Sequence, residues 1–513
     1  MPSRPAAWRV LLFLVAVVLA GAPLRADQPE FCVAGTVLNA QTGEPLRRAA
    51  VTIPEAAALT DAAGAFRFCS LPAGAYYANA EKPGFVAAGA SVVVGPSREN
   101  VVLRLQPLCV IGGKVVDAAG EPAPNVLVQL LAIQVAEGRR KVRVESAVAA
   151  DDRGEYRLAG LSAGRYYLRV AGWEGATGNP DEGEAFAPVY YGGAAELASA
   201  APVTVEPGRE LRADFSVSLR NAYRIRGAIA GFSPLLPAKI ELLGGGLEPS
   251  PAPVTLDAAT GKFQIDDVAP GSYVLRATQG EGRERTRGEL ALQVNADVKG
   301  VVVPLAGSVV LRGIVRMPAA SAQAAPSSPN CAIKLSPAET WISEEAALEA
   351  STGPAGEFAI EDVLPGRYRV GMACANGYIS AARIGETDLL ANPELPIPPG
   401  PSLPPIEAVL ASDGGTLDVT ASAEGEPGPA WVLLLPASGY ELHARLARLK
   451  AQLTFQAVAP GDYQAYAWAG SPEAFEYANP DARQAWAGRA LSVHVAERDR
   501  QSITVKVAPG EAP

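Results

Sequence analysis

The sequence predicts an all-β protein: a tandem array of about five small antiparallel β-sandwiches that follows an N-terminal signal peptide. Three observations support this fold class. A phrase of fixed spacing occurs five times, large apolar residues alternate with other residues inside it, and the 513 residues include 51 glycines and 44 prolines. A period of this kind indicates one supersecondary unit copied in series, and frequent turn residues are typical of short antiparallel strands.

Each phrase has a glycine, an alternating apolar run, a second glycine ten positions later and a tyrosine two positions after that. In the first copy, Gly64 is followed by Phe66 and Phe68, then by Gly74 and Tyr76. A period of two puts one set of side chains on one face, so each run predicts a half-buried strand that turns at the second glycine into another strand. The copies span 64–76, 154–166, 261–273, 356–368 and, with Ala451 in place of the first glycine, 451–463.

Aspartates precede the first glycine of several phrases, as at Asp61, Asp151 and Asp257. An aspartate carboxylate accepts hydrogen bonds from backbone amides just downstream, and glycine adopts the positive φ of a tight turn. A calcium loop would need a spaced series of carboxylates, which no copy offers. We therefore expect these aspartates to cap turns.

The repeat spacing sets the expected domain organisation. Successive second glycines lie 90, 107, 95 and 95 residues apart, a suitable length for a small sandwich with its own core. The short links between the copies predict an elongated rod with limited bending. We expect a signal peptide at 1–26 and sandwiches at 27–106, 107–220, 221–306, 307–411 and 412–513, the second of which carries an aromatic insert at 173–205.

The first residues have the pattern of a secretory signal. Arg4 and Arg9 flank the start of an apolar run over 10–22, and small residues follow up to Ala26. Such a segment is cleaved after export and is too short to span a bilayer comfortably. We expect a secreted or periplasmic protein, cleaved near Ala26 and not inserted in the membrane afterwards; an uncleaved anchor is the alternative.

Export makes the five cysteines candidates for disulfide bonds. Cys331 and Cys374 lie in the same copy and form the preferred pair. Cys32, Cys69 and Cys109 cannot all pair internally. We expect a bond between Cys32 and Cys69; a bridge between Cys69 and Cys109, or buried thiols that form no bond, are the alternatives.

The first copy resembles a known family. Its residues 33–37, Thr42-Gly43-Glu44-Pro45-Leu46 and 71–76 closely resemble the carboxypeptidase regulatory-like domain, a transthyretin-like β-sandwich whose wider relatives include the collagen-adhesin B-type stalk repeat and the starch-binding-like sandwich. The second copy is similar as well, and the later copies mainly in the phrase. The resemblance implies the fold and a secreted bacterial type of protein, but no particular activity.

The sequence lacks the residues that an enzyme of this kind would need. A metallocarboxypeptidase requires histidine and glutamate ligands around zinc, and the only histidines, His443 and His494, stand outside any such motif. We expect His494 to face outward from a strand and His443 to lie in a helical connecting segment over 440–450. No enzymatic activity, metal or cofactor is expected, and the net charge of −10 argues against nucleic acid as a partner.

Aromatic residues outside the phrase are the candidate ligand-binding residues. Rings on loops stack on sugars or anchor protein interfaces, although they also cover the ends of sandwiches. We expect a non-enzymatic scaffold or adhesion protein that mediates protein interaction or spacing at the cell envelope, with an unknown protein or polysaccharide as its partner. The alternative is an array of carbohydrate-binding modules that recognises polysaccharide through these aromatics. They are Trp173, Tyr190, Tyr191, Trp468 and Trp486.

Overall fold

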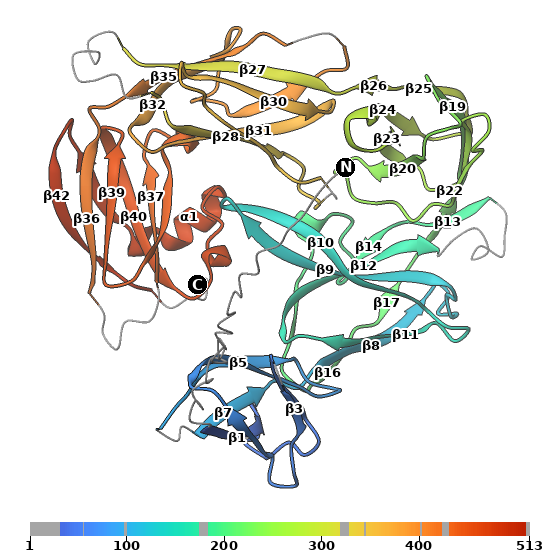
Figure 1. Cartoon of the computed structure of the whole chain (residues 1–513). Helices are drawn as coiled ribbons and strands as arrows, with labels where there is room; N and C mark the ends of the chain where they lie inside the picture. Colours follow the sequence, from blue (N-terminus) through green and yellow to red (C-terminus); the bar gives the residue numbers. More distant parts are fainter. Residues whose placement is uncertain are drawn as a thin grey trace, which may run out of the picture. The chain divides into compact units, whose positions relative to one another are not determined.

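The computed structural model describes residues 31–54, 56–96, 100–173, 183–318, 328–342, 345–400, 403–422 and 430–508; the expected signal peptide and its cleavage site lie outside them. Within these ranges almost all regular structure is β, and no helix is long and apolar enough to cross a membrane. The strands form paired sheets in each of five modules (Figure 1), which confirms the predicted series of sandwiches.

Module 1 pairs the sheet β4-β1-β7 with the sheet β3-β2-β5-β6, and its core lies between them. Its strands are β1 (Phe31–Asn39), β2 (Ala50–Ile53), β3 (Ala56–Leu59), β4 (Ala65–Leu71), β5 (Gly74–Glu81), β6 (Ala88–Val94) and β7 (Asn100–Leu105).

Module 2 pairs a sheet around β8 with the sheet β10-β9-β12-β14, in which β15 also pairs with β12, while β13 pairs with β18. Its elements are β8 (Cys109–Val116), β9 (Val126–Ala136), β10 (Arg139–Ala149), β11 (Glu155–Leu161), β12 (Gly164–Trp173), β13 (Glu184–Phe186), β14 (Val189–Tyr190), η1 (Leu197–Ser199), β15 (Val203–Val205), β16 (Glu210–Arg212), β17 (Phe215–Ser216) and β18 (Leu219–Asn221).

Module 3 pairs the sheet β21-β22-β19-β25 with β20-β23-β24-β26, and module 4 pairs β30-β27-β35-β32-β33 with β29-β28-β31-β34. Module 3 has β19 (Tyr223–Ala230), β20 (Ala238–Gly244), β21 (Val254–Leu256), β22 (Lys262–Val268), β23 (Gly271–Gln279), η2 (Gly282–Glu284), β24 (Thr286–Val294), β25 (Val298–Pro304) and β26 (Ala306–Gly307). Module 4 has β27 (Val309–Arg316), β28 (Cys331–Pro337), β29 (Leu348–Ser351), β30 (Glu357–Val363), β31 (Gly366–Cys374), β32 (Tyr378–Ile384), β33 (Thr387–Asp388), β34 (Glu394–Ile397) and β35 (Ile406–Ala411).

Module 5 pairs the sheet β39-β36-β42 with β38-β37-β40-β41. Its elements are β36 (Gly415–Ser422), β37 (Ala430–Pro436), η4 (Glu441–His443), β38 (Arg445–Leu449), β39 (Gln452–Val458), β40 (Gly461–Ala469), η5 (Pro472–Ala474), α1 (Pro480–Trp486), η6 (Ala487–Arg489), β41 (Leu491–Val495) and β42 (Arg500–Lys506). Of the segment expected to be helical over 440–450, only η4, which contains His443, is helical, because residues 445–449 form an edge strand of this sheet.

One strand pair in every module departs from the antiparallel prediction. The opening strand of each module pairs in parallel with a strand from the end of the same module, as β1 does with β7 and β36 with β42. A parallel pair needs a long connection. Here the intervening strands, which cross to the other sheet and back, provide that connection.

The first glycine and the tyrosine of the phrase have clear physical roles. Gly64 has a φ of 71°, and a Cβ there would lie 2.6 Å from the carbonyl oxygen of Val37 on the opening strand, so only glycine fits. The tyrosine hydroxyl donates a hydrogen bond to the carbonyl four residues earlier, as Tyr273 does to Ala269 at 2.8 Å and Tyr463 to Ala459 at 2.8 Å. Each phrase therefore fixes its own turn and anchors the next strand.

The turn aspartates and the cysteines behave as expected. Asp61 accepts hydrogen bonds from the amides of Ala63 (2.9 Å) and Ala65 (2.8 Å). The predicted Cys32–Cys69 bond joins neighbouring strands of module 1, and the predicted Cys331–Cys374 bond joins β28 and β31 of module 4. Cys109 is fully buried at the start of β8 and takes part in neither bond.

The chain divides into two compact units, one holding module 1 and the other the greater part of modules 2–5. In the second unit, module 2 does not contact only its neighbour in sequence. The β9–β10 hairpin extends to module 5 (Figure 1), where the amide of Ala478 donates to the carbonyl of Gly138 at 2.9 Å. This contact joins two modules that are not neighbours in the sequence.

Candidate functional site

The most elaborate polar site lies on the outer faces of two sheets of the second unit. In each module, one of the two sheets contains the repeat tyrosine. We call the side of that sheet that is turned away from the core the outer face of the module. Three residues after that tyrosine, modules 2 and 3 carry Arg169 and Arg276, whose side chains point outward yet are almost completely buried. A segment of module 4 covers both of them.

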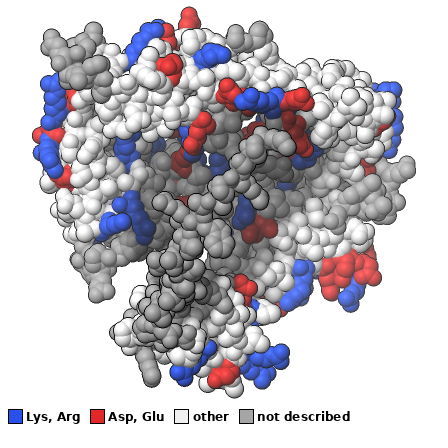
Figure 2. Space-filling view, viewed as in Figure 1, with Lys and Arg blue, Asp and Glu red and all other residues white. Residues whose placement is uncertain are grey.

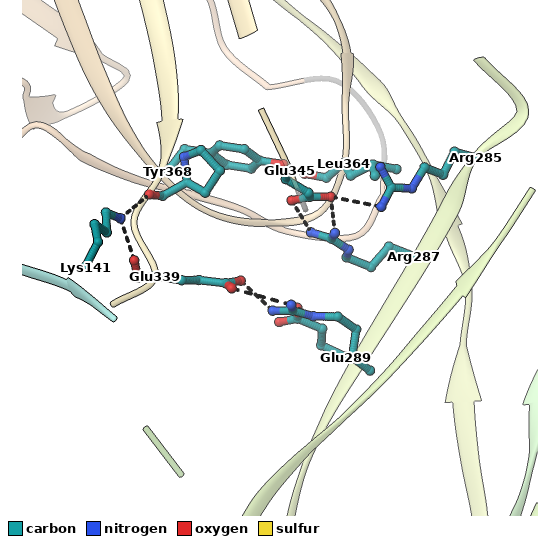
Figure 3. Close-up of polar contacts among 10 residues, drawn as sticks. Lys141, Arg285, Arg287, Glu289, Glu339, Glu345, Leu364 and Tyr368 are labelled. Carbon is teal, nitrogen blue, oxygen red and sulfur yellow. Dashed lines mark hydrogen bonds and ion pairs between the residues drawn. The ribbon is translucent and has the colours of Figure 1, made fainter. Parts of the chain in front are cut away.

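This covering segment connects β28 to β29 and comprises residues 338–347, of which all but 343 and 344 are described; we call it the docking loop. It reaches module 3 through Glu339 and Glu345 (Figure 3) and module 2 through Trp341. Trp341 is buried, although it lies on a connecting segment. The loop is therefore an interface element rather than a solvated turn.

Carboxylates of the loop neutralise the arginines of module 3. Arg276 binds Glu339 through its terminal nitrogens and Glu289 of its own sheet through Nε at 2.7 Å. Burial lowers the pKa of Arg276, but Glu289 and Glu339 outweigh that effect and leave the pKa raised.

A second pairing on the same face follows this pattern. Arg287 binds both carboxylate oxygens of Glu345, and Arg285 lies 3.4 Å from the same group. Planar guanidinium groups suit such two-point recognition of a carboxylate.

Arg169 is held differently. Its Nη1 donates to the carbonyl of Pro249 at 3.2 Å, and its Cζ lies 6.0 Å from the ring centre of Tyr190 and 5.9 Å from that of Trp341. Among the described residues no carboxylate forms an ion pair with it, and burial lowers its pKa. Aromatic rings and carbonyl oxygens hold this cation in place of an anion.

Backbone pairing completes the junction between modules 2 and 4. The amide of Val142 donates to the carbonyl of Thr340, and the amide of Ile342 donates to the carbonyl of Val142, both at 2.8 Å. Lys141 Nζ donates to the carbonyl oxygen of Pro337 at 3.0 Å and to that of Glu339 (Figure 3), and burial lowers the pKa of Lys141.

The outer face of module 4 is contacted in turn by two other modules. Lys334 pairs with Glu137, at the tip of the β9–β10 hairpin of module 2, at 2.7 Å. Arg369 pairs with Glu441 of module 5 at 2.8 Å. Glu137 lies in the loop after β9, and Glu441 lies in the loop after β37. In each module this strand is the first one, in chain order, of the sheet that contains the repeat tyrosine.

A pocket of about 490 Å³ opens beside the docking loop. Arg276, Arg285 and Arg287 line it, together with Glu339 and Glu345. Because these arginines already bind carboxylates, the pocket offers no uncompensated cluster of charge to a ligand.

The candidate ligand-binding aromatic residues do not form an exposed surface on which a sugar ring could stack. Trp468 and Trp486 are 0% and 1% exposed, and both pack on Phe475 within module 5. A buried ring has no free face on which a sugar could stack, so the burial of Trp468 and Trp486 gives no support to the prediction that they bind a ligand.

The three candidates in module 2 are also occupied. Trp173 packs against Phe186 with ring centres 4.6 Å apart, Tyr190 is buried beside Arg169, and the half-buried Tyr191 meets Phe215 edge-on. The arrangement therefore gives no support to polysaccharide recognition through these rings.

The two histidines lie in unrelated places. His443 is partly buried, where its Nε2 lies 2.6 Å from the carbonyl oxygen of Ile379, and burial lowers its pKa. His494 is exposed on β41, as expected, and bonds Asp462 at 2.7 Å. In the described part of the chain, no three side chains of His, Cys, Asp or Glu are grouped to hold a metal ion.

Sequence reasoning missed the residues that make this site: Arg169, Arg276, Arg287, Glu339, Trp341 and Glu345. Period-two alternation places both Arg169 and Arg276 on the outward side of a strand, which normally means solvent. The available signal was their recurrence, because an arginine stands three residues after the tyrosine in two successive phrases.

On the face shown in Figure 2, basic and acidic side chains are interspersed, and no extended basic patch of the kind that binds nucleic acid is seen among the described residues.

Comparison with known families bears on module 1. Residues 33–106 match the carboxypeptidase regulatory-like domain. The resemblance inferred from the first copy is thereby confirmed for that stretch. No curated protein sequence matches the chain.

Among solved structures, the chain is similar to pilins. The minor pilin GBS52 of Streptococcus agalactiae is 15% identical over 37% of this chain and 95% of its own, with a TM-score of 0.22. The shaft pilin SpaA of Lactobacillus rhamnosus GG is 12% identical over 38% and 99%, with a TM-score of 0.22. The major pilin subunit BcpA of Bacillus cereus is 10% identical over 59% and 98%, with a TM-score of 0.17. Scores this low carry no argument about function.

Proposed function

We propose that this protein is a non-enzymatic scaffold of the cell envelope or the extracellular space, in which modules 2–5 act as one rigid body. The observation that carries the proposal is the burial of Arg169 and Arg276 under the docking loop of module 4. In a string of independent modules these outer faces would be exposed to solvent. Here they contact other modules and hold them together.

Two further features support an exported scaffold. The disulfides Cys32–Cys69 and Cys331–Cys374 are typical of proteins that leave the cytoplasm. The most elaborate cluster of charged side chains consists of ion pairs between modules rather than of groups converging on a substrate pocket. The expected partner is a protein at the envelope.

Hydrogen exchange measured by mass spectrometry tests the rigid body. Replacing both Glu339 and Glu345 with Ala in module 4 should speed amide exchange in β10 of module 2 and β24 of module 3. The control Glu386→Ala changes an exposed glutamate of module 4 and should leave those strands protected. Independent modules would show changes in module 4 alone, and that result would refute the proposal.

The location has its own test. Protein recovered from the medium or the periplasm should begin at Asp27 and carry both disulfides on non-reducing peptide mapping. Recovery in the cytoplasm with reduced cysteines would contradict export.

A further inference from the structure

The outer face of module 4 lacks a large side chain that three other modules carry. Three residues after the repeat tyrosine, modules 2, 3 and 5 have Arg169, Arg276 and Tyr466, all of which are buried. Module 4 has Gly371 at this position, on β31 and opposite Lys334 of β28. A Cβ on Gly371 would meet its nearest neighbour, the Cβ of Lys334, at 3.7 Å, so a side chain would fit there. The face of module 4 is therefore hollow where the other three are filled.

A pocket of about 500 Å³ lies over this hollow. Its lining includes the small residues Ala332 and Ala373, which face each other across β28 and β31. Module 5 contributes apolar side chains, among them Leu435 and Leu446. The volume falls within the ~300–1,000 Å³ of small-molecule sites. Apart from its charged residues the lining is mostly apolar, so the pocket suits a ligand with an apolar body.

The charges around the pocket leave a positive excess. Four basic and three acidic residues line it. Two of the carboxylates, those of Glu137 and Glu441, already form the ion pairs with module 4 described above. Arg445 on β38 and Arg483 on α1 form no ion pair with any residue that the structure describes. The lining therefore has one more positive than negative charge.

Arg445 has an unused edge of its guanidinium group. Its Nη1 donates to the carbonyl oxygens of Leu442 at 3.0 Å and Ala444 at 3.3 Å, which leaves Nε and Nη2 without a hydrogen bond to the described residues. These two donors form one edge of the planar group and can bind both oxygens of a carboxylate. Arg445 is half-buried, and burial lowers its pKa. An anion bound there would compensate a positive charge that is partly removed from water.

We propose that this pocket binds a small organic monocarboxylate, with its carboxylate on Arg445 and its apolar body over Gly371. One carboxylate matches the excess of one positive charge. Sugars and polyphosphates fit less well, because their many polar groups would lose water against an apolar lining. The inference goes beyond the proposed scaffold function but rests on it, since modules 2, 4 and 5 together form the pocket.

Ligand-observed NMR on the purified protein tests the site, with 4-phenylbutyrate as the probe and the uncharged 4-phenylbutan-1-ol as its comparison. The wild type should bind the acid with a dissociation constant on the order of 1 mM. Arg445→Met should weaken this binding about tenfold, to the level of the alcohol. The matched control Arg448→Met changes an exposed arginine of the same strand that does not line the pocket, and should bind as the wild type does.

A second variant fills the pocket instead of removing its charge. Gly371→Leu should abolish binding of both the acid and the alcohol, because its side chain occupies the hollow. Circular dichroism checks that each variant is folded. A wild type that binds no acid, an alcohol that binds as tightly as the acid, or an Arg445→Met chain that binds the acid normally overturns the proposal.

The source of the carboxylate has its own arm. Acetyl-Ala-Leu presents the same group at the end of a peptide. Tighter binding of this peptide than of 4-phenylbutyrate would assign the pocket to a peptide C-terminus, and weaker binding would assign it to a free acid; both require Arg445. Hydrogen exchange in β10 and β24 measures the rigid body separately, so failure of the pocket and failure of the scaffold are distinguishable.

Discussion

Arg169 and Arg276 occupy the same position of the repeat, three residues after its tyrosine, and both are buried under one loop, yet their environments differ. Arg276 is bound by the carboxylates of Glu339 and Glu289. Arg169 is flanked by the rings of Tyr190 and Trp341 and bonded to a carbonyl. The directions of their pKa shifts are opposite, raised for Arg276 and lowered for Arg169.

The difference shows that the repeat determines the position of the arginine in the strand. It does not determine whether carboxylates or aromatic rings and carbonyl oxygens surround the positive charge. Removing one member of a buried ion pair leaves an uncompensated charge, whereas removing a buried cation that has no anion leaves none. The two arginines should therefore respond differently to the same substitution.

The largest effect is expected for Arg276→Met. Glu339 is only 11% exposed, so loss of its partner should lower the free energy of unfolding of modules 2–5 by about 3–5 kcal/mol. Guanidinium-induced unfolding followed by tryptophan fluorescence measures this. The control Arg283→Met removes a cation that is 80% exposed and should change the midpoint little.

Trp341→Ala should come next. It removes the ring that covers Arg169 and leaves a cavity at the junction, at a cost of about 3 kcal/mol. Amide exchange of Val142, which donates to Thr340, should become faster, while Ala80 in the core of module 1 should stay protected. Unchanged exchange at Val142 would mean that Trp341 does not hold this junction.

A smaller effect is expected for Arg169→Met. The substitution keeps an unbranched side chain between the two rings and leaves no carboxylate unpaired, so the free energy of unfolding should change by less than about 1.5 kcal/mol. The same unfolding experiment applies. A loss as large as that of Arg276→Met would show that the cation itself holds the junction, and would remove the contrast between the two sites.

The smallest effect concerns an exposed pair. A double-mutant cycle on Arg283 and Glu361, both largely solvent-exposed, should give a coupling of about 0.5 kcal/mol or less. The equivalent cycle on Arg276 and Glu339 should give several times more at the same salt concentration. Equal couplings would contradict the assignment of buried and exposed pairs.

Sequence pattern alone accounts for most of the fold. Gly64 and its equivalents, the alternation through Phe66 and Phe68, and the turn at Asp61 are local devices, in which residues a few positions apart decide the backbone. Such local patterns of residues can be recognised in a sequence because they recur at the same spacing in each copy. For the same reason the five sandwiches could be predicted, and the two disulfides followed from the places of their cysteines within the copies, although they join residues 37 and 43 positions apart. The parallel closing pair, which also joins residues tens of positions apart, could not be predicted.

The site could not be predicted in this way. Arg276 and Glu339 are 63 residues apart, and Arg140 and Glu476 are 336 apart. An outward strand position has the same pattern whether solvent or another module covers it. The sequence by itself determined the repeated module, its core and its turns. Only the tertiary structure decided which outer faces are buried, because that depends on which loop of a distant module meets which sheet.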